Sequence, residues 1–160
     1  MAESSGRVTL RPITSGNRQA VEDLQVLPEQ ENFVDGVSRS LAEAAAKPHA
    51  RPWYRSIYAG EVPVGFVMLA DGVPPGNEDI PWRYYLWRFL IDARFQGRGY
   101  GRSALDSVVS YLRTRPDAEL LVTSVVPGDG SPLAFYLKYG FRVTGQMFDR
   151  EQVLELPVTR

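Results

Sequence analysis

Several residue types and patterns are absent from this sequence, and each absence removes a class of function. None of the 160 residues is cysteine, which excludes disulfides, thiolate metal ligands and a cysteine nucleophile. The formal net charge is −1, whereas non-specific nucleic-acid binding needs a basic excess. No apolar run approaches the ~18 residues that a membrane-spanning helix requires. We therefore expect no metal centre, no nucleic-acid partner and no membrane anchor.

The N-terminal residues carry no targeting pattern. Residues 1–11 lack the apolar core of a secretory signal, so a cytoplasmic protein is expected. Residues 1–6 are expected to form a disordered lead. The length is sufficient for one hydrophobic core, and no linker, repeat or low-complexity tract divides the chain. Residues 1–160 are therefore expected to form a single domain.

The hydrophobic pattern predicts an α/β domain with a mixed sheet. Apolar residues at helical spacing run from Leu105 to Leu112, and alternating or continuous apolar runs indicate strands. Gly60-Glu61 lies between two such runs and predicts a hairpin. The expected order is β-α-α-β-β-β-α-β-α-β-β. Strands are expected at 7–11, 53–59, 62–70, 84–91, 120–126, 141–147 and 152–156, and helices at 14–24, 33–46, 103–113 and 131–139.

A glycine-dense turn, Gln96 to Gly101, separates the strand at 84–91 from the helix at 103–113. Glycines bring bare backbone N–H groups together at a helix N-terminus, where these groups and the helix dipole favour an anion. Three glycines in six positions therefore predict a phosphate-bearing ligand. The simplest alternative is that the glycines only permit a tight turn.

Two common phosphate motifs fit this turn poorly. A dinucleotide-binding motif that starts at Gly97 requires glycine at position 102, where the chain has Arg102. Starting at Gly99 places Ala104 in the third position, which the motif tolerates, but that motif normally opens the first βα unit of a parallel sheet. A P-loop requires Gly-Lys, a pair that the sequence does not contain.

The pattern Gln-x-x-Gly-x-Gly, at Gln96, Gly99 and Gly101, resembles the acetyl-CoA signature of the GNAT family of N-acetyltransferases. Residues 134–141, Ala-Phe-Tyr-Leu-Lys-Tyr-Gly-Phe, resemble a later motif of that family, a helix that carries Tyr and ends in Gly-Phe. The order and separation of the elements also match, over nearly the whole chain. The resemblance implies a single-domain GNAT fold with six to seven strands and about four helices.

The resemblance also implies where acetyl-CoA binds. The end of the strand at 84–91 pairs with the pantetheine arm as an added strand, and the glycine turn and neighbouring arginines hold the phosphates. The family often has Asn seven residues before the motif Tyr, where this chain has Asp129. The expected cofactor-binding residues are Phe89, Leu90, Ile91, Gln96, Gly97, Arg98, Gly99, Tyr100, Gly101, Arg102 and Asp129.

Tyr136 is the candidate catalytic residue. Transfer from a thioester to an amine expels a thiolate, and a tyrosine hydroxyl can protonate that sulfur. The family resemblance places Tyr136 in this role, whereas Phe135 and Tyr139 suit packing better. The single histidine, His49, lies in an expected loop, so the general base stays open.

The acceptor site is expected in the N-terminal third and the loop before the central strand, as the resemblance implies. Six acids and one base lie between Glu22 and Glu43, and acids there attract a cationic amine. Within the family, residues 30–34 and 85–89 look like bacterial polyamine acetyltransferases. The resemblance also makes a homodimer plausible. The alternatives are an aminoglycoside-like antibiotic, an amino acid or a protein N-terminus as acceptor, or a non-catalytic CoA-binding sensor. The expected substrate-binding residues are Glu29, Glu31, Phe33 and Tyr85.

Overall fold

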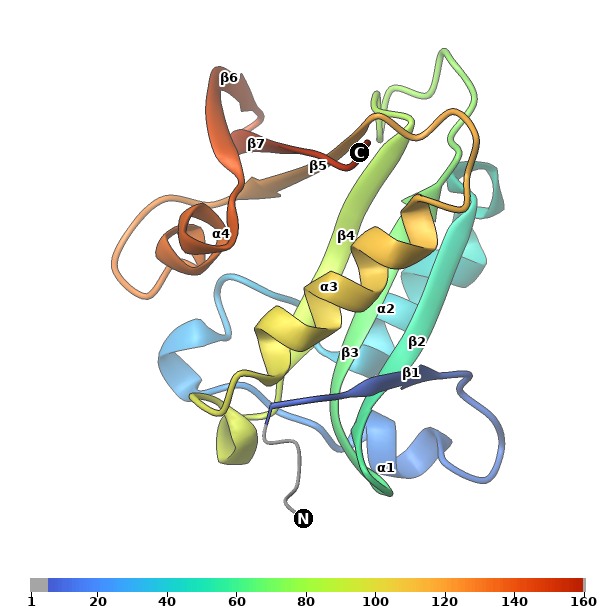
Figure 1. Ribbon diagram of the computed structural model, residues 1–160, viewed down its shortest axis with the longest axis vertical. Coiled ribbons are helices and arrows are strands. Elements are labelled where there is room, and N and C mark those ends of the chain that lie inside the picture. Colours follow the sequence, from blue (N-terminus) through green and yellow to red (C-terminus); the bar gives the residue numbers. More distant parts are fainter. Residues whose placement is uncertain (1–5, 160) are drawn as a thin grey trace.

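The computed structural model describes residues 6–159, in which seven strands form one sheet (Figure 1). The strand order is β1-β2-β3-β4-β5-β7-β6, and only the β4–β5 pair is parallel. This arrangement confirms the expected α/β class and mixed sheet. The strands are β1 (Thr9–Arg11), β2 (Pro52–Ala59), β3 (Val62–Asp71), β4 (Tyr84–Ile91), β5 (Leu120–Val125), β6 (Arg142–Phe148) and β7 (Glu151–Pro157).

Four α-helices cover the two faces of the sheet. Apolar residues of β3 alternate between the faces, as a strand buried on both sides requires. Val67 and Leu69 pack with α3, whereas Phe66 and Met68 pack with α1 and α2. The helices are α1 (Arg18–Glu22), α2 (Val37–Ala46), α3 (Tyr100–Leu112) and α4 (Leu133–Tyr139), with short 3₁₀ segments η1 (Pro28–Gln30), η2 (Pro48–Ala50) and η3 (Ala93–Phe95).

All four helices begin at different residues from those expected, and for α2 and α3 the reason is the local backbone conformation. The spacing of Phe33 predicts a helix from residue 33, but α2 begins at Val37, with Gly36 as its extended N-cap. Phe33 therefore lies in a loop. Helix α3 begins at Tyr100, inside the glycine turn, because Gly99 at φ 84° makes the change of direction that starts the helix.

The expected disordered lead falls on residues 1–5, which lie outside the described residues, and on Gly6. Gly6 is placed against the glycine turn, where an added Cβ would lie 3.1 Å from the carbonyl oxygen of Arg98. No helix in the part of the chain that the structure describes has the length and apolarity to cross a membrane.

Strands β4 and β5 separate immediately after they meet. They share a single paired position, Tyr85 with Val122, and diverge beyond it (Figure 1). On its other side β4 stays paired with β3 from Tyr84 to Ile91, with a bulge that leaves Trp87 unmatched. One edge of β4 is therefore free of strand pairing over most of its length, and this gap creates the space for the site.

Candidate active site

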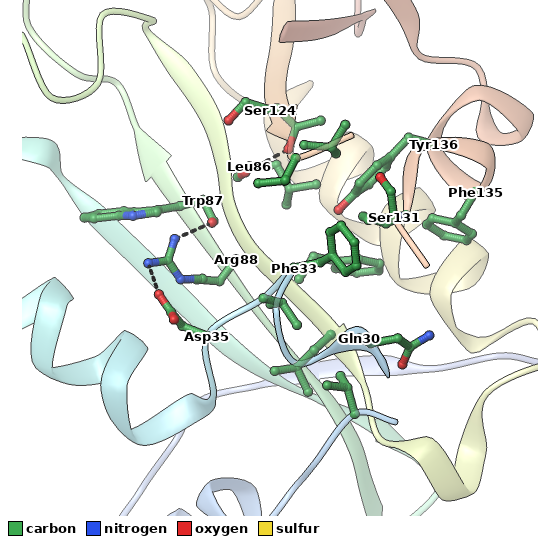
Figure 2. Close-up of a pocket in the computed structure, with 18 of the residues that line it drawn as sticks. Gln30, Phe33, Asp35, Leu86, Trp87, Arg88, Ser124, Ser131, Phe135 and Tyr136 are labelled. Atoms are coloured by element: carbon green, nitrogen blue, oxygen red, sulfur yellow. Dashed lines mark hydrogen bonds and ion pairs between the residues drawn. The ribbon is translucent and has the colours of Figure 1, made fainter. Parts of the chain in front are cut away.

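A cavity of about 1270 Å³ opens where β4 and β5 separate (Figure 2). Its walls come from β4, the glycine turn, the start of α3, helix α4, the loop after η1, the loop before β4 and the β6–β7 turn. Segments that are far apart in the sequence therefore meet at one place. The cavity has a volume suited to a large ligand, since most small-molecule sites span roughly 300–1,000 Å³.

The glycine turn forms one end of this cavity. Gly97 and Gly99 have φ angles of 79° and 84°, in the left-handed region that favours glycine. The first N–H groups of α3 have no acceptors within the helix, and such groups suit an anion. Gly101 allows close packing, because an added Cβ would lie 3.1 Å from the Phe135 ring.

Two glutamines hold the turn to the strand and to the loop after α1. The Gln96 amide nitrogen donates to the Ile91 carbonyl and to Gln30 Oε1, both at 2.8 Å. Gln30 Nε2 donates in return to Gln96 Oε1 at 3.2 Å. Gln30 also accepts from the Leu27 backbone N–H. Gln96 thus orients the end of β4, and Gln30 is a supporting residue that the sequence did not reveal.

Nine of the eleven expected cofactor-binding residues line the cavity, and two do not. Arg98 lies outside it, with its guanidinium over the Phe95 ring at 5.7 Å from the centroid. Asp129 is exposed in the loop before α4 and is also outside. The residues that line it are Phe89, Leu90, Ile91, Gln96, Gly97, Gly99, Tyr100, Gly101 and Arg102.

Tyr136 lies on α4 with its hydroxyl directed into the cavity (Figure 2). It is only 6% exposed and is surrounded by the rings of Phe89, Phe135 and Phe141, with centroids 5.2–6.5 Å away. Burial raises the pKa of the Tyr136 hydroxyl, an effect that the Thr123 hydroxyl partly opposes. The hydroxyl is therefore protonated at neutral pH and available as a proton donor.

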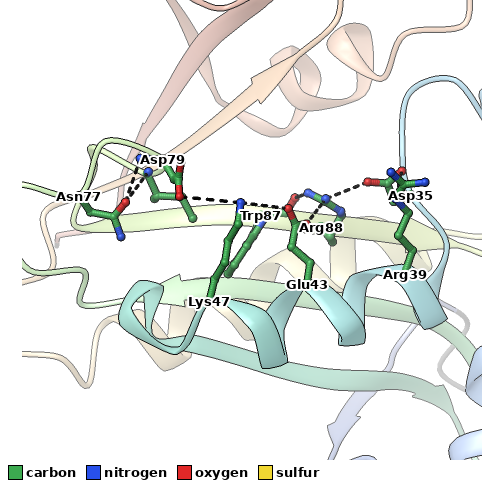
Figure 3. A network of polar contacts seen from close by, with 9 residues as sticks. Asp35, Arg39, Glu43, Lys47, Asn77, Asp79, Trp87 and Arg88 are labelled. Atoms are coloured by element: carbon green, nitrogen blue, oxygen red, sulfur yellow. Dashed lines mark hydrogen bonds and ion pairs between the residues drawn. The ribbon is translucent and has the colours of Figure 1, made fainter.

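Carboxylates dominate the opposite end of the cavity. Two cations, Lys47 and Arg88, lie among them in a row of alternating charge (Figure 3). Arg88 pairs with Asp35 at 2.9 Å and with Glu43. Lys47 is 3.4 Å from Glu43 and 3.9 Å from Asp79. The seven carboxylates that line the cavity are Glu31, Asp35, Glu43, Glu78, Asp79, Asp149 and Glu151.

Three polar side chains form a hydrogen-bonded chain across β4, β5 and β7. Tyr85 Oη lies 2.6 Å from Ser124 Oγ, and Ser124 Oγ donates to Glu151 Oε1 at 2.6 Å. All three line the cavity. Ser124 and Glu151 were not among the expected site residues. One signal was available: Thr123-Ser124 interrupts an otherwise apolar buried strand.

Three of the four expected substrate-binding residues line the cavity, and one does not. Glu31, Phe33 and Tyr85 line the cavity, and the Phe33 ring lies near Tyr136 (Figure 2). Glu29 does not line it and is exposed. Its carbonyl instead lies against Gly130, so the loop after η1 meets the loop before α4.

Comparison with known proteins agrees with this geometry. Residues 18–141 match the model of the acetyltransferase (GNAT) family. A spermine/spermidine N(1)-acetyltransferase from Bacillus subtilis (strain 168) is 26% identical over 148 residues, which cover 92% of this chain and 96% of the relative.

Solved structures show the same fold. An acetyltransferase from Thermus thermophilus has a TM-score of 0.71 at 21% identity, covering 94% of this chain and 97% of that one. A spermidine N-acetyltransferase from Vibrio cholerae, crystallised with CoA and spermine, has a TM-score of 0.65 at 15% identity, covering 94% and 95%. The chain therefore belongs to the GNAT family of acetyltransferases, and it is an acetyl-CoA-dependent N-acetyltransferase.

Proposed function

We propose that this enzyme acetylates a primary amine of a small polycation of the polyamine class. The observation that carries the proposal is the acidic lining of the cavity, which contains seven carboxylates, whereas the cations Lys47 and Arg88 are already engaged in ion pairs with three of them. Such a surface attracts and retains a ligand with several ammonium groups. The name of the Bacillus subtilis relative, a spermine/spermidine N(1)-acetyltransferase, supports the same acceptor class.

The donor end of the cavity fits acetyl-CoA. The N–H groups at the start of α3 suit the pyrophosphate. Arg102 and Lys138 also line the cavity and add positive charge. The unpaired edge of β4 from Phe89 to Ile91 offers backbone groups to the amide-bearing pantetheine arm. In this arrangement a β4 N–H polarises the thioester carbonyl, as an oxyanion-hole donor does.

The chemical step in this proposal is direct attack of the amine on the thioester carbon. The chain has no cysteine, so an acyl-cysteine intermediate is excluded and both substrates are bound together. The new C–N bond forms as the C–S bond breaks, and Tyr136 gives its proton to the departing sulfur. Its buried, protonated hydroxyl supports that role. The second proton on the acylated nitrogen then leaves and restores the Tyr136 hydroxyl, so that a neutral amide and free CoA thiol are the products.

A thiol-release screen with acetyl-CoA tests the acceptor class. Spermine, spermidine and putrescine are compared with an aminoglycoside, free amino acids and a short peptide, each at the same concentration and ionic strength. We expect the highest kcat/KM with spermine or spermidine. Clear release with another class, but none with polyamines, contradicts the polyamine proposal. A protein that binds CoA but releases thiol with no amine is instead a sensor.

A further inference from the structure

The chain of Tyr85, Ser124 and Glu151 runs along the cavity wall from β4 to a carboxylate on β7. Both contacts, from Tyr85 to Ser124 and from Ser124 to Glu151, measure 2.6 Å, which is within the range of good O–H···O hydrogen bonds. Tyr85 is held in place by Trp82, whose ring stacks on it at a centroid distance of 5.1 Å. Tyr85 lies on β4, Ser124 on β5 and Glu151 on β7, which pairs with β5. The three groups are therefore held in place by strands of one sheet.

The direction of these hydrogen bonds follows from the chemistry of the last member. An ionised carboxylate only accepts hydrogen bonds, so the Ser124 hydroxyl donates to Glu151. Ser124 has one proton, which leaves its oxygen to accept from Tyr85. The Tyr85 oxygen then presents its lone pairs to the cavity. Both hydroxyls thus donate in the direction of Glu151, which is the order needed to pass a proton from Tyr85 to that carboxylate.

Charged groups from each neighbouring element surround this chain. Burial is the main effect on the pKa of Tyr85, and it raises that pKa. The negative charges of Glu151 on β7 and Glu43 on α2 also raise it, whereas the positive charge of Arg88 on β4 lowers it. Asp149, on the β6–β7 turn, is the next carboxylate that lines the cavity. Tyr85 therefore stays a neutral phenol that can accept one proton while it passes on its own.

We propose that Tyr85, Ser124 and Glu151 form the proton relay that deprotonates the acceptor amine. The N–H bond of the ammonium breaks as a proton moves to Tyr85 Oη. The Tyr85 proton moves to Ser124, and the Ser124 proton moves to the Glu151 carboxylate, which becomes neutral. The freed nitrogen lone pair attacks the thioester carbon. Glu151 is half-buried and returns the proton to water before the next turnover. This inference rests on the proposed function.

Glu151→Gln tests the relay, because glutamine keeps an acceptor oxygen for Ser124 but cannot take up the proton. With the best amine of the screen, we expect kcat at pH 7 to fall about 100-fold, with the KM for acetyl-CoA unchanged. The loss should shrink as the pH approaches the pKa of the free amine, near 10, because the amine then arrives already neutral. A loss that stays the same from pH 7 to ~10, or no loss at all, overturns the relay.

Three further variants separate the relay from charge and folding effects. Ser124→Ala interrupts the chain without removing the carboxylate and should reproduce the same pH-dependent loss. Tyr85→Phe removes the oxygen proposed to take the proton from the amine, and it should cause the same pH-dependent loss of kcat. Asp149→Asn is the matched control: it removes a neighbouring carboxylate, and asparagine suits the positive φ of 55° at that residue. We expect it to raise the KM of the amine while the pH profile of kcat stays that of the parent.

The two proposals fail in different ways. If the parent releases thiol only with a non-polyamine acceptor, the polyamine assignment fails while the relay is still measured with that acceptor. If the parent acetylates spermine and Glu151→Gln does so equally well at pH 7, the relay fails and the polyamine assignment stands. If the Ser124→Ala variant retains full activity at pH 7, the relay is also overturned.

Discussion

At the residue scale, helix α4 carries two tyrosines that serve as a matched pair. Tyr136 is buried with its hydroxyl facing the cavity, whereas the Tyr139 hydroxyl donates to Asp106 at 2.7 Å. Tyr136→Phe removes the proposed proton donor, so we expect kcat to fall by about 10²–10⁴-fold. The Kd for CoA, measured by calorimetry, should be retained. Tyr139→Phe should leave kcat within about twofold of the parent. Equal effects from both variants would contradict the assignment to Tyr136.

Asp92 offers a second test, one of stability and pH. Its carboxylate is 3% exposed and accepts from the Gln25 and Arg94 backbone N–H groups and from the Arg94 side chain, at 2.8–2.9 Å. Burial alone would raise the pKa of Asp92, but the hydrogen bonds from Arg94 and Gln25 outweigh it and lower the pKa below its ordinary 3.8. The ionised form therefore stabilises the fold above about pH 4, and this stability is lost as the pH falls through the folded-state pKa.

Asp92→Asn places an amide NH₂ group against N–H donors. We expect the free energy of unfolding to fall by about 2 kcal/mol at pH 7, measured by urea denaturation. The difference from the parent should narrow below about pH 4, where Asp92 itself becomes protonated. Asp23→Asn, at an exposed position, is the control and should change stability by less than about 0.5 kcal/mol. A constant difference across this pH range would show that the charge of Asp92 is not the cause.

The sequence predicted some site residues and missed others for identifiable reasons. Tyr136 and the glycine turn belong to contiguous motifs, so local order alone indicates them. Ser124 and Glu151 come from different strands and meet only because β5 pairs with β7. Nothing local in the sequence encodes that contact. Arg88 was likewise missed, because its partners Asp35 and Glu43 come from a loop and from α2.

At the element scale, the start of α3 depends on the backbone conformation of Gly99. Alanine at φ 84° carries a strain of roughly 1–2 kcal/mol and disturbs the N–H groups proposed to bind phosphate. We therefore expect Gly99→Ala to lower stability by that amount and to weaken CoA binding at least tenfold. Thermal unfolding and calorimetry measure the two effects separately.

Gly60→Ala is the control for this change. Gly60 also has a positive φ, 61°, with no atom within 4 Å of an added Cβ, and it lies in the β2–β3 turn. The same strain is expected there with CoA affinity unchanged. If Gly60→Ala weakened CoA binding as much as Gly99→Ala, the loss would reflect general destabilisation rather than the turn.

Element boundaries also show where sequence patterns stop being informative. The order of strands and helices was predicted correctly, because each element has its own apolar period. Phe33 was placed in a helix because its spacing to Val37 and Leu41 is helical. In the structure the helix begins at Val37, after the N-cap Gly36, and Phe33 instead lines the cavity. The separation of β4 and β5 could not be predicted, since it depends on pairing between strands that α3 separates in sequence.

At the scale of the whole molecule, charge is balanced overall but unevenly distributed within the cavity. The net charge is −1, yet the cavity is lined by seven carboxylates. Dissolved salt screens such a field over roughly 10 Å at 0.1 M. Raising the salt from ~0.05 to ~0.5 M should therefore increase the KM of spermine several-fold.

Acceptors of different charge provide the comparison for this salt effect. Butylamine has one ammonium group, so its KM should change much less than that of spermine under the same conditions. Steady-state thiol release gives both values. An equal salt dependence for the two amines would indicate that salt acts on acetyl-CoA binding or on the fold, and not on attraction of the acceptor.

The single paired position between β4 and β5 also bears on how long the protein survives. Strands β1–β4 and β5–β7 form two half-sheets joined by strand pairing only at Tyr85 and Val122. In the proposed binding mode a cofactor seated in the gap contacts both halves, and a ligand at a hundred times its Kd adds about 2.7 kcal/mol to the stability of the state that binds it. Resistance to proteolysis should then rise and fall with the supply of acetyl-CoA. We therefore expect the lifetime of the enzyme to increase with the concentration of acetyl-CoA, its own substrate.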